Sequence, residues 1–153
     1  MKEIKGDLWE YHKQGNTICI TTNSTVDNKR KLVMGKGTAK QAKDKYPELA
    51  DYFAYCLDEH GLGLMYAQKE NILAFPTKDH WKKPSKLDLI RESAKELQKF
   101  VDWHKKNPGT VEKVKFPIIL PKPGCGAGEL TWEQVKPVLE SILSDDVHII
   151  DKE

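Results

Sequence analysis

The sequence predicts an α/β protein with a mostly parallel sheet covered on both faces by helices. Short apolar runs rich in β-branched residues recur along the chain, and stretches with apolar residues three or four positions apart separate them. Two glycine-rich clusters each follow such a run and precede a helical stretch. Strands that alternate with helices form sheets of this kind, and their ligands bind beyond the carboxyl ends of the strands.

The first half of the chain contains one predicted strand and two helical stretches. The run "NTICITTN" predicts a buried strand ending near Thr22, and the polar loop "STVDNKRK" follows it. Helical spacing begins at Ala39 and restarts at Pro47, which suits the first position of a helix. Gly61 is placed to end the second stretch. Its apolar stripe consists of Leu49, Tyr52, Phe53, Cys56 and Leu57.

Two short strands and a long helix come next. "LGLMYAQ" and "NILAFPT" have strand composition, and "KEN" between them predicts a turn. Ser85, with Asp88 three residues later, has the pattern of a helix N-cap. The buried face of that helix is predicted to consist of Ile90, Ala94, Leu97 and Val101.

The last part of the chain predicts two strands and one helix. In the strand "VKFPIILP", Pro117 indicates a bulge or an edge position. Thr131 and Gln134 form a capping box for the next helix, which Pro137 should bend. The segment "DVHIID" is the final strand. The apolar stripe of the helix consists of Trp132, Val135, Leu139 and Ile142.

Composition excludes several classes of protein. The 153 residues suit one domain, and a net charge of +2 does not by itself indicate a nucleic-acid-binding protein. No apolar run approaches the roughly 20 residues of a membrane span, and the polar N-terminus is not a signal peptide, so we expect a cytoplasmic protein without membrane contact. The three cysteines and five histidines are scattered, which predicts no metal site and no disulfide framework.

The glycine clusters are candidate anion sites. The first contains Gly35 and Gly37, and the second, "PKPGCGAGEL", contains Gly124, Gly126 and Gly128. Glycine lets the backbone approach a ligand, and a helix start supplies free N–H groups. The P-loop motif is absent, and "GKGTAK" lacks the third glycine of the dinucleotide fingerprint. Two such loops at one sheet edge would hold a diphosphate from both sides, whereas the alternative is two ordinary turns.

Five segments, taken in order, resemble a macro domain. They are similar to the family's opening G-D-[IL], its strand ending in asparagine, its M-G-x-G-[IL]-A-x-Q loop, its lysine-bearing strand end and its G-C-G-x-G-x-L-x-W loop. The segments are "GDLWEY", "ITTNSTV", "VMGKGTAKQAKDKYPEL", "FPTKDHWKKPS" and "GCGAGELTWEQV". The resemblance is strongest to terminal ADP-ribose glycohydrolases and to antitoxins that remove ADP-ribose from DNA. It implies one macro domain over residues 1–153, with three α/β/α layers and a mixed, mostly parallel sheet.

The resemblance also implies where ADP-ribose binds. Asp7 matches the acid that contacts adenine, and Asn23 matches the asparagine that holds the distal ribose, although the long loop after it leaves Asn28 as a rival. The region near the last strand lacks the family's aromatic support for adenine, so Ile150 is a substitute or adenine is held loosely. The implied ligand-binding residues are Asp7, Leu8, Asn23, Met34, Gly35, Lys36, Gly37, Thr38, Pro123, Gly124, Cys125, Gly126, Ala127 and Gly128.

Lys78, Asn23 and His80 are the candidate catalytic residues. Lys78 matches the family's catalytic lysine, whose unprotonated amine attacks the anomeric carbon or stabilises the opened aldehyde as a Schiff base. His80 is a candidate acid or base, or a plain surface residue. One branch pairs its lysine with an aspartate where this chain has Gly128, which favours the branch that acts on DNA. Cys125 has no evident histidine partner and is not expected to be a nucleophile.

The expected function is a hydrolase that removes ADP-ribose from DNA or protein, without a cofactor and as a monomer. An ADP-ribose 1″-phosphate phosphatase and a non-catalytic ADP-ribose reader are the alternatives. Basic runs with aromatic neighbours, such as "HWKKP" and "WHKKNP", are also typical of single-strand nucleic-acid binding. We therefore include ADP-ribosylated nucleic acid among the expected partners.

Overall fold

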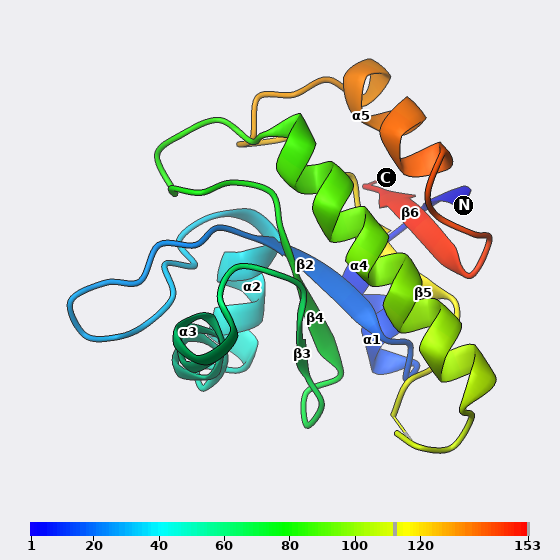
Figure 1. The fold of residues 1–153 in the computed structure, drawn as a ribbon, viewed down its shortest axis with the longest axis horizontal. Helices are drawn as coiled ribbons and strands as arrows, with labels where there is room; N and C mark the ends of the chain where they lie inside the picture. Colours follow the sequence, from blue (N-terminus) through cyan, green and yellow to red (C-terminus); the bar gives the residue numbers. More distant parts are fainter. Residues whose placement is uncertain (112, 153) are drawn as a thin grey trace.

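The computed structural model describes residues 1–111 and 113–152, and a mixed sheet forms its centre (Figure 1). The strands of this six-stranded sheet lie in the order β1-β6-β5-β2-β4-β3. Neighbours pair in parallel except β3 and β4, which form an antiparallel hairpin. The strand bounds are β1 Lys2–Lys5, β2 Ile18–Thr22, β3 Met65–Ala67, β4 Ile72–Pro76, β5 Ile118–Pro121 and β6 Val147–Asp151.

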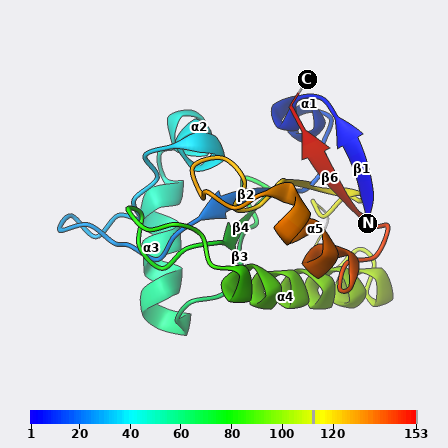
Figure 2. The same cartoon turned by 90° about the horizontal axis from the view of Figure 1, so that it is seen from above.

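Helices cover both faces of this sheet and make the expected three layers. The bounds are α1 Leu8–Lys13, α2 Gly37–Lys45, α3 Leu49–His60, α4 Leu87–Lys106 and α5 Trp132–Glu140. Helices α1, α2 and α3 share one apolar cluster with one face of the sheet, and α4 and α5 share a second cluster with the other. Figure 2 shows α4 on one side of the strands and α1 and α2 on the opposite side.

Successive side chains of a strand point to opposite faces of the sheet, and this alternation assigns them to one or the other of the two clusters. In β5, Ile118 and Leu120 pack toward α4 and α5, whereas Ile119 packs toward the opposite layer. Both sets are buried, which explains why the strands have near-continuous apolar sequences. The predicted α/β fold with a mostly parallel sheet is confirmed. Among the described residues, no helix has the length and apolar character that crossing a membrane requires.

Three local predictions need correction, and two elements were missed. The strand β1 and helix α1 were not predicted, because the edge strand "KEIK" has mostly exposed positions and no apolar run. Helix α3 begins at Leu49, two residues after Pro47. Lys86, not Ser85, is the N-cap of α4, and no side chain caps that helix. Pro117 precedes β5, which is an interior strand, so this proline removes no hydrogen bond from the ladder.

The other element predictions hold except at two stripe residues: Tyr52 of α3 is 42% exposed, and Ile142 lies beyond the end of α5. The capping box of Thr131 and Gln134 is present, and Pro137 lies inside α5. The four apolar residues predicted for the buried face of α4 are all buried. Gly61 caps α3 with a φ of 77°, in the left-handed region that favours glycine.

Candidate functional site

A cavity of about 450 Å³ opens at the carboxyl edge of the parallel strands. Residues 21–23 at the end of β2 form one wall, and residues 33–39 lead from it into α2. Segments after β4 and β5 complete the lining, namely Thr77, Lys78, Trp81 and Ser85, and residues 121, 122 and 124–128. The two glycine clusters therefore meet at one cavity, as the sequence predicted.

The first glycine loop presents free main-chain donors to the cavity. Lys36 is the N-cap of α2 but makes no side-chain capping bond, so the first N–H groups of this helix have no partner within it. The helix start is tied to β2 instead, because the Thr21 N–H donates to Thr38 Oγ1 at 3.2 Å. A rigid and uncapped helix start facing a cavity is a site for an anion.

The second loop supplies its donors without help from a helix. Helix α5 begins at Trp132, beyond this loop, and its N-terminus is satisfied by the capping box. The expectation that this helix start binds the ligand is therefore wrong. No hydrogen bond between described residues uses the N–H groups of residues 124–128. The loop is held through its carbonyls, because Leu130 N–H donates to Gly124 and Ser85 N–H donates to Gly128, both at 2.9 Å.

Glycine occupies these loop positions for different reasons. A Cβ on Gly128 would lie 2.3 Å from Ser85 Oγ and 2.5 Å from the Gly124 carbonyl, so the packed loop has no room for it. A Cβ on Gly35 or Gly126 would meet no protein atom within 4 Å. Neither of these two residues has positive φ. The fold itself does not require glycine at either position, whereas a ligand pressed against the backbone does.

The charge of the lining is positive. Lys36, Lys78 and Lys122 contribute ammonium groups, and none of the residues that line the cavity is an aspartate or glutamate. Lys122 is partly neutralised, because its Nζ lies 3.0 Å from a carboxylate oxygen of Asp151 and lowers the pKa of that acid. A cationic concave surface with free N–H groups favours a phosphorylated ligand.

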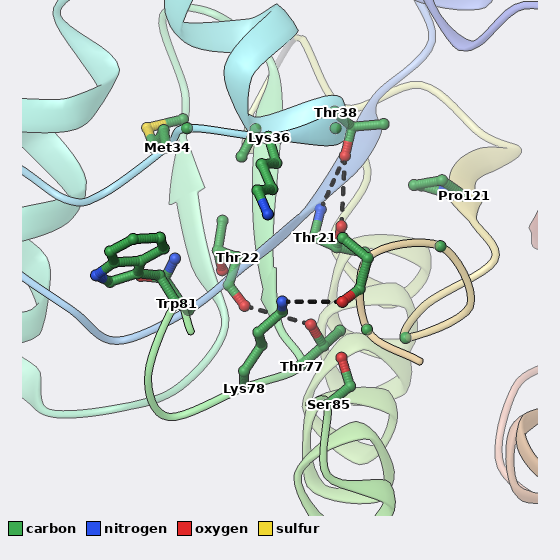
Figure 3. Close-up of a pocket in the computed structure, with 18 of the residues that line it drawn as sticks. Thr21, Thr22, Met34, Lys36, Thr38, Thr77, Lys78, Trp81, Ser85 and Pro121 are labelled. Atoms are coloured by element: carbon green, nitrogen blue, oxygen red, sulfur yellow. Dashed lines mark hydrogen bonds between the residues drawn. The ribbon is translucent and has the colours of Figure 1, made fainter. Parts of the chain in front are cut away.

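Lys78 projects into this cavity from the segment after β4 (Figure 3). Its Nζ donates a long hydrogen bond of 3.4 Å to the carbonyl of Ala127 in the second loop. The buried hydroxyls of Thr22 and Ser85 line the same cavity, and neither has a hydrogen-bond partner among the described residues. Buried unpaired hydroxyls are uncommon in folded proteins, which sets these two residues of the cavity wall apart from the rest of the core.

Asn23 lies in the cavity wall, whereas its rival Asn28 is exposed and outside the lining. The Asn23 amide closes the loop that follows it: Nδ2 donates to the Val33 carbonyl at 2.9 Å, and Oδ1 accepts from the Thr25 N–H at 3.0 Å. An amide has a second proton and a second lone pair, so it can still meet two hydroxyls. This placement supports the ribose role predicted for Asn23.

The other predicted site residues divide into two groups. Met34, Cys125 and Ala127 line the cavity with the glycines. Burial raises the pKa of the Cys125 thiol, which disfavours the nucleophilic thiolate. Four predicted residues lie outside the cavity lining, namely Asp7, Leu8, His80 and Pro123.

Asp7 and His80 have structural partners where they lie. Asp7 is the exposed N-cap of α1, where its carboxylate accepts from the Trp9 N–H at 2.9 Å. His80 Nδ1 accepts from the Lys82 N–H at 3.1 Å, within its own loop. Their roles toward adenine and as an acid or base stay predictions.

Sequence reasoning missed several cavity residues. Thr22, Thr77 and Ser85 place hydroxyl groups in the lining, and Trp81 and Lys122 flank it. Most of these residues share one sequence signal, because they lie at the end of a strand or just after it. In a parallel sheet, those positions converge on one edge, so this rule would have identified Thr22, Thr77 and Lys122 but not Trp81 or Ser85.

Comparisons with known proteins agree with this architecture. The chain matches no profile of a known protein family. It is 34% identical over 155 residues to a DNA ADP-ribosyl glycohydrolase of Thermus aquaticus, covering 94% of this chain and 38% of that relative. The solved macrodomain of Thermus aquaticus DarG aligns with a TM-score of 0.69 at 25% identity, covering 99% of this chain and 97% of that one.

A third protein has the same fold with a ligand bound. Thermosipho africanus DarTG, solved in complex with ADP-ribose, aligns with a TM-score of 0.70 at 22% identity, covering all of this chain and 42% of that one.

The six-stranded sheet, its two helical layers and the paired glycine loops at its carboxyl edge define the chain as a macro domain. Within that class it is similar to the DarG branch, which confirms the resemblance seen in the sequence. The chain spans 38% of the length of the Thermus aquaticus glycohydrolase.

Proposed function

We propose that this macro domain is a hydrolase that removes ADP-ribose from DNA. The observation that carries the proposal is the meeting of two loops with free N–H groups at one cationic cavity, into which Lys78 projects. The similarity to a DNA ADP-ribosyl glycohydrolase supports DNA as the carrier, and the ADP-ribose complex of Thermosipho africanus DarTG supports the ligand.

The chemistry follows from what surrounds the Lys78 amine. With the diphosphate held by the two glycine loops and the distal ribose at Asn23, the anomeric carbon of that ribose comes within reach of Lys78. In its unprotonated form, the amine attacks this carbon while the bond to DNA breaks and the leaving group takes up a proton, or it stabilises the opened aldehyde as a Schiff base. Water then releases ADP-ribose and regenerates the lysine.

The test compares wild-type protein with Lys78→Ala on three substrates: ADP-ribosylated DNA, ADP-ribosylated protein and ADP-ribose 1″-phosphate. We expect wild type to release ADP-ribose from DNA fastest, and kcat to fall at least about 100-fold in the variant. Affinity for free ADP-ribose should change by less than about threefold, because the main-chain donors remain. Lys99→Ala, on the exposed side of α4, is the matched control and should behave as wild type.

Each other outcome identifies a different function. Release of inorganic phosphate from the third substrate alone would establish the phosphatase alternative. Tight binding of ADP-ribose without turnover of any substrate would establish the reader. Equal rates in wild type and Lys78→Ala on every substrate would remove Lys78 from the mechanism.

Three further properties belong to the same proposal. Residues 1–153 are proposed to act as a single macro domain, as a monomer and in the cytoplasm. Gel filtration and fractionation of cells that express the full-length protein test the last two.

A further inference from the structure

We propose that Trp81 and the basic loop around it form the platform on which a base of single-stranded DNA stacks while its ADP-ribose occupies the cavity. This inference rests on the proposed function and identifies the surface that receives the carrier. Trp81 is 38% exposed and lines the cavity with Lys78. Figure 3 shows its indole on one side of the Lys78 amine, with the hydrogen bond to loop 124–128 on the other.

The position of Trp81 relative to Lys78 decides which part of a substrate it meets. The glycine loops hold the diphosphate, and Lys78 lies near the reacting end of the ligand. Whatever is attached to the anomeric carbon must therefore leave the cavity past Lys78, on the side away from loop 124–128. Trp81 lies on that side in Figure 3, so we infer that its ring meets the carrier.

Trp81 is held in place although it is exposed. Its main-chain N–H donates to Thr25 Oγ1 at 3.2 Å. Ser24 N–H and Oγ donate to the Asp79 carbonyl at 3.3 and 2.5 Å, and Lys83 N–H donates to the His80 carbonyl at 3.0 Å. The bonds of Thr25 and Ser24 attach the loop after β4 to the loop after β2, and the bond between Lys83 and His80 closes a turn within the loop after β4. The main chain that carries the indole is therefore fixed, so a planar partner has only the Trp81 side chain to order when it binds.

The surroundings of the indole are cationic and aromatic. The His80 ring stacks beside it with centroids 6.1 Å apart, and Lys82 Nζ lies 5.1 Å from its centroid. Lys86 is paired with Asp79, but Lys82 and Lys83 form no ion pair with another described residue. Aromatic rings that take up bases, flanked by free cations for phosphates, are the elements of single-strand binding.

The same surface fits a protein carrier less well. A modified carboxylate or hydroxyl side chain of a protein has no planar ring at the linkage, so the indole would gain little from it. An acidic protein would form ion pairs with the lysines but would not stack on the indole ring. Base stacking is largely independent of sequence, because every base has an aromatic face, and we therefore infer little sequence preference from Trp81 itself.

The first experiment measures binding of an unmodified single-stranded oligonucleotide by fluorescence anisotropy, which does not depend on turnover. We expect Trp81→Ala to weaken binding about tenfold and Trp81→Phe to restore most of it. Trp103→Ala is the matched control: Trp103 is 49% exposed on α4, beside Lys105 and Lys106, and does not line the cavity. Lys82→Ala should reduce the slope of log Kd against log salt by about one.

The second experiment measures kcat and KM on an ADP-ribosylated oligonucleotide and on an ADP-ribosylated protein. Trp81→Ala should raise KM for the oligonucleotide about tenfold, change KM for the protein less than twofold, and leave the affinity for free ADP-ribose within about threefold of wild type. An equal loss on free ADP-ribose would make Trp81 a part of the nucleotide pocket and overturn the inference. So would oligonucleotide binding that is unchanged in Trp81→Ala.

The two proposals fail in different ways. If wild type hydrolyses no substrate, the hydrolase proposal fails, while loss of oligonucleotide binding in Trp81→Ala but not Trp103→Ala still establishes the platform. If turnover depends on Lys78 but oligonucleotide binding and KM do not depend on Trp81, the hydrolase proposal stands and the platform does not.

Discussion

Neither backbone conformation nor packing within the protein explains why positions 35 and 126 are glycines. Neither has positive φ, and a Cβ on either would have no protein atom within 4 Å. Both line the same cavity from opposite loops. The fold needs no glycine at either position, so the free space next to these two backbones is the space that we assign to the diphosphate.

Alanine at these two positions should separate binding from stability. We predict that Gly35→Ala and Gly126→Ala each weaken ADP-ribose binding at least about tenfold, because the new methyl group occupies ligand space. Thermal stability should be unchanged or slightly higher, since alanine restricts the unfolded chain. Calorimetric titration and thermal unfolding measure the two effects. Gly128→Ala is the contrast: its Cβ would lie 2.3 Å from Ser85 Oγ, and overpacking should cost about 1–3 kcal/mol of stability.

The sequence predicts residues of this site only where a local signal exists. The glycine clusters and Lys78 carry such signals, through spacing and through resemblance to macro domains. Ser85 does not, because its importance lies in a hydroxyl buried without a partner, which depends on how distant segments pack. Ser85 is an example of a misread signal: its pattern suggests a helix cap, but its main-chain N–H instead holds the Gly128 carbonyl.

At the scale of elements, both glycine loops present main-chain N–H groups to the cavity, but the structures that leave these groups free differ. The first presents the uncapped start of α2, whereas the second presents loop amides, and its helix α5 is closed by a capping box. A mutation in the cap of α5 should therefore leave the N–H groups of the second loop in place. This difference could not be predicted from glycine spacing, because both clusters precede a helix in the sequence.

The capping box of α5 should contribute to stability and not to binding. We predict that Thr131→Ala destabilises the protein by about 1 kcal/mol and lowers Tm by about 2–4 °C, because the first N–H groups of α5 lose an acceptor. Thr131→Ser keeps the hydroxyl and should restore Tm. ADP-ribose affinity of the folded protein should stay within twofold of wild type in calorimetric titration. A large loss of affinity in Thr131→Ala would show that α5 itself holds the ligand.

Most elements were predictable because they are long or buried on both sides. The apolar stripe of α4 and the continuous run of β2 gave the right type of element at the right place. The edge strand β1 and the short helix α1 were missed, because exposed edge positions carry no periodic signal and six residues are too few for a stripe. Pro117 suggested a bulge or an edge strand, but β5 lies inside the sheet. The proline is compatible with that place because it precedes the paired residues.

At the scale of the whole molecule, strand order fixes the order of contacts along the ligand. Asp7 follows β1, the second glycine loop follows β5, Asn23 follows β2, and Lys78 follows β4. Because the sheet order is β1-β6-β5-β2-β4, the contacts that we propose for these groups follow the order adenine, diphosphate, distal ribose and reacting carbon. Four strand spacings separate the two ends, which is about 19 Å and suits an extended nucleotide sugar.

The central claim is that the main-chain amides of both loops hold one diphosphate. Nuclear magnetic resonance of 15N-labelled protein tests it most directly, by following the amide signals of residues 35–38 and 124–128 as ADP-ribose is added. We predict that signals from both loops shift together and give a single Kd, in wild type and in Lys78→Ala alike. Shifts confined to one loop, or centred on a different part of the molecule, would contradict the account.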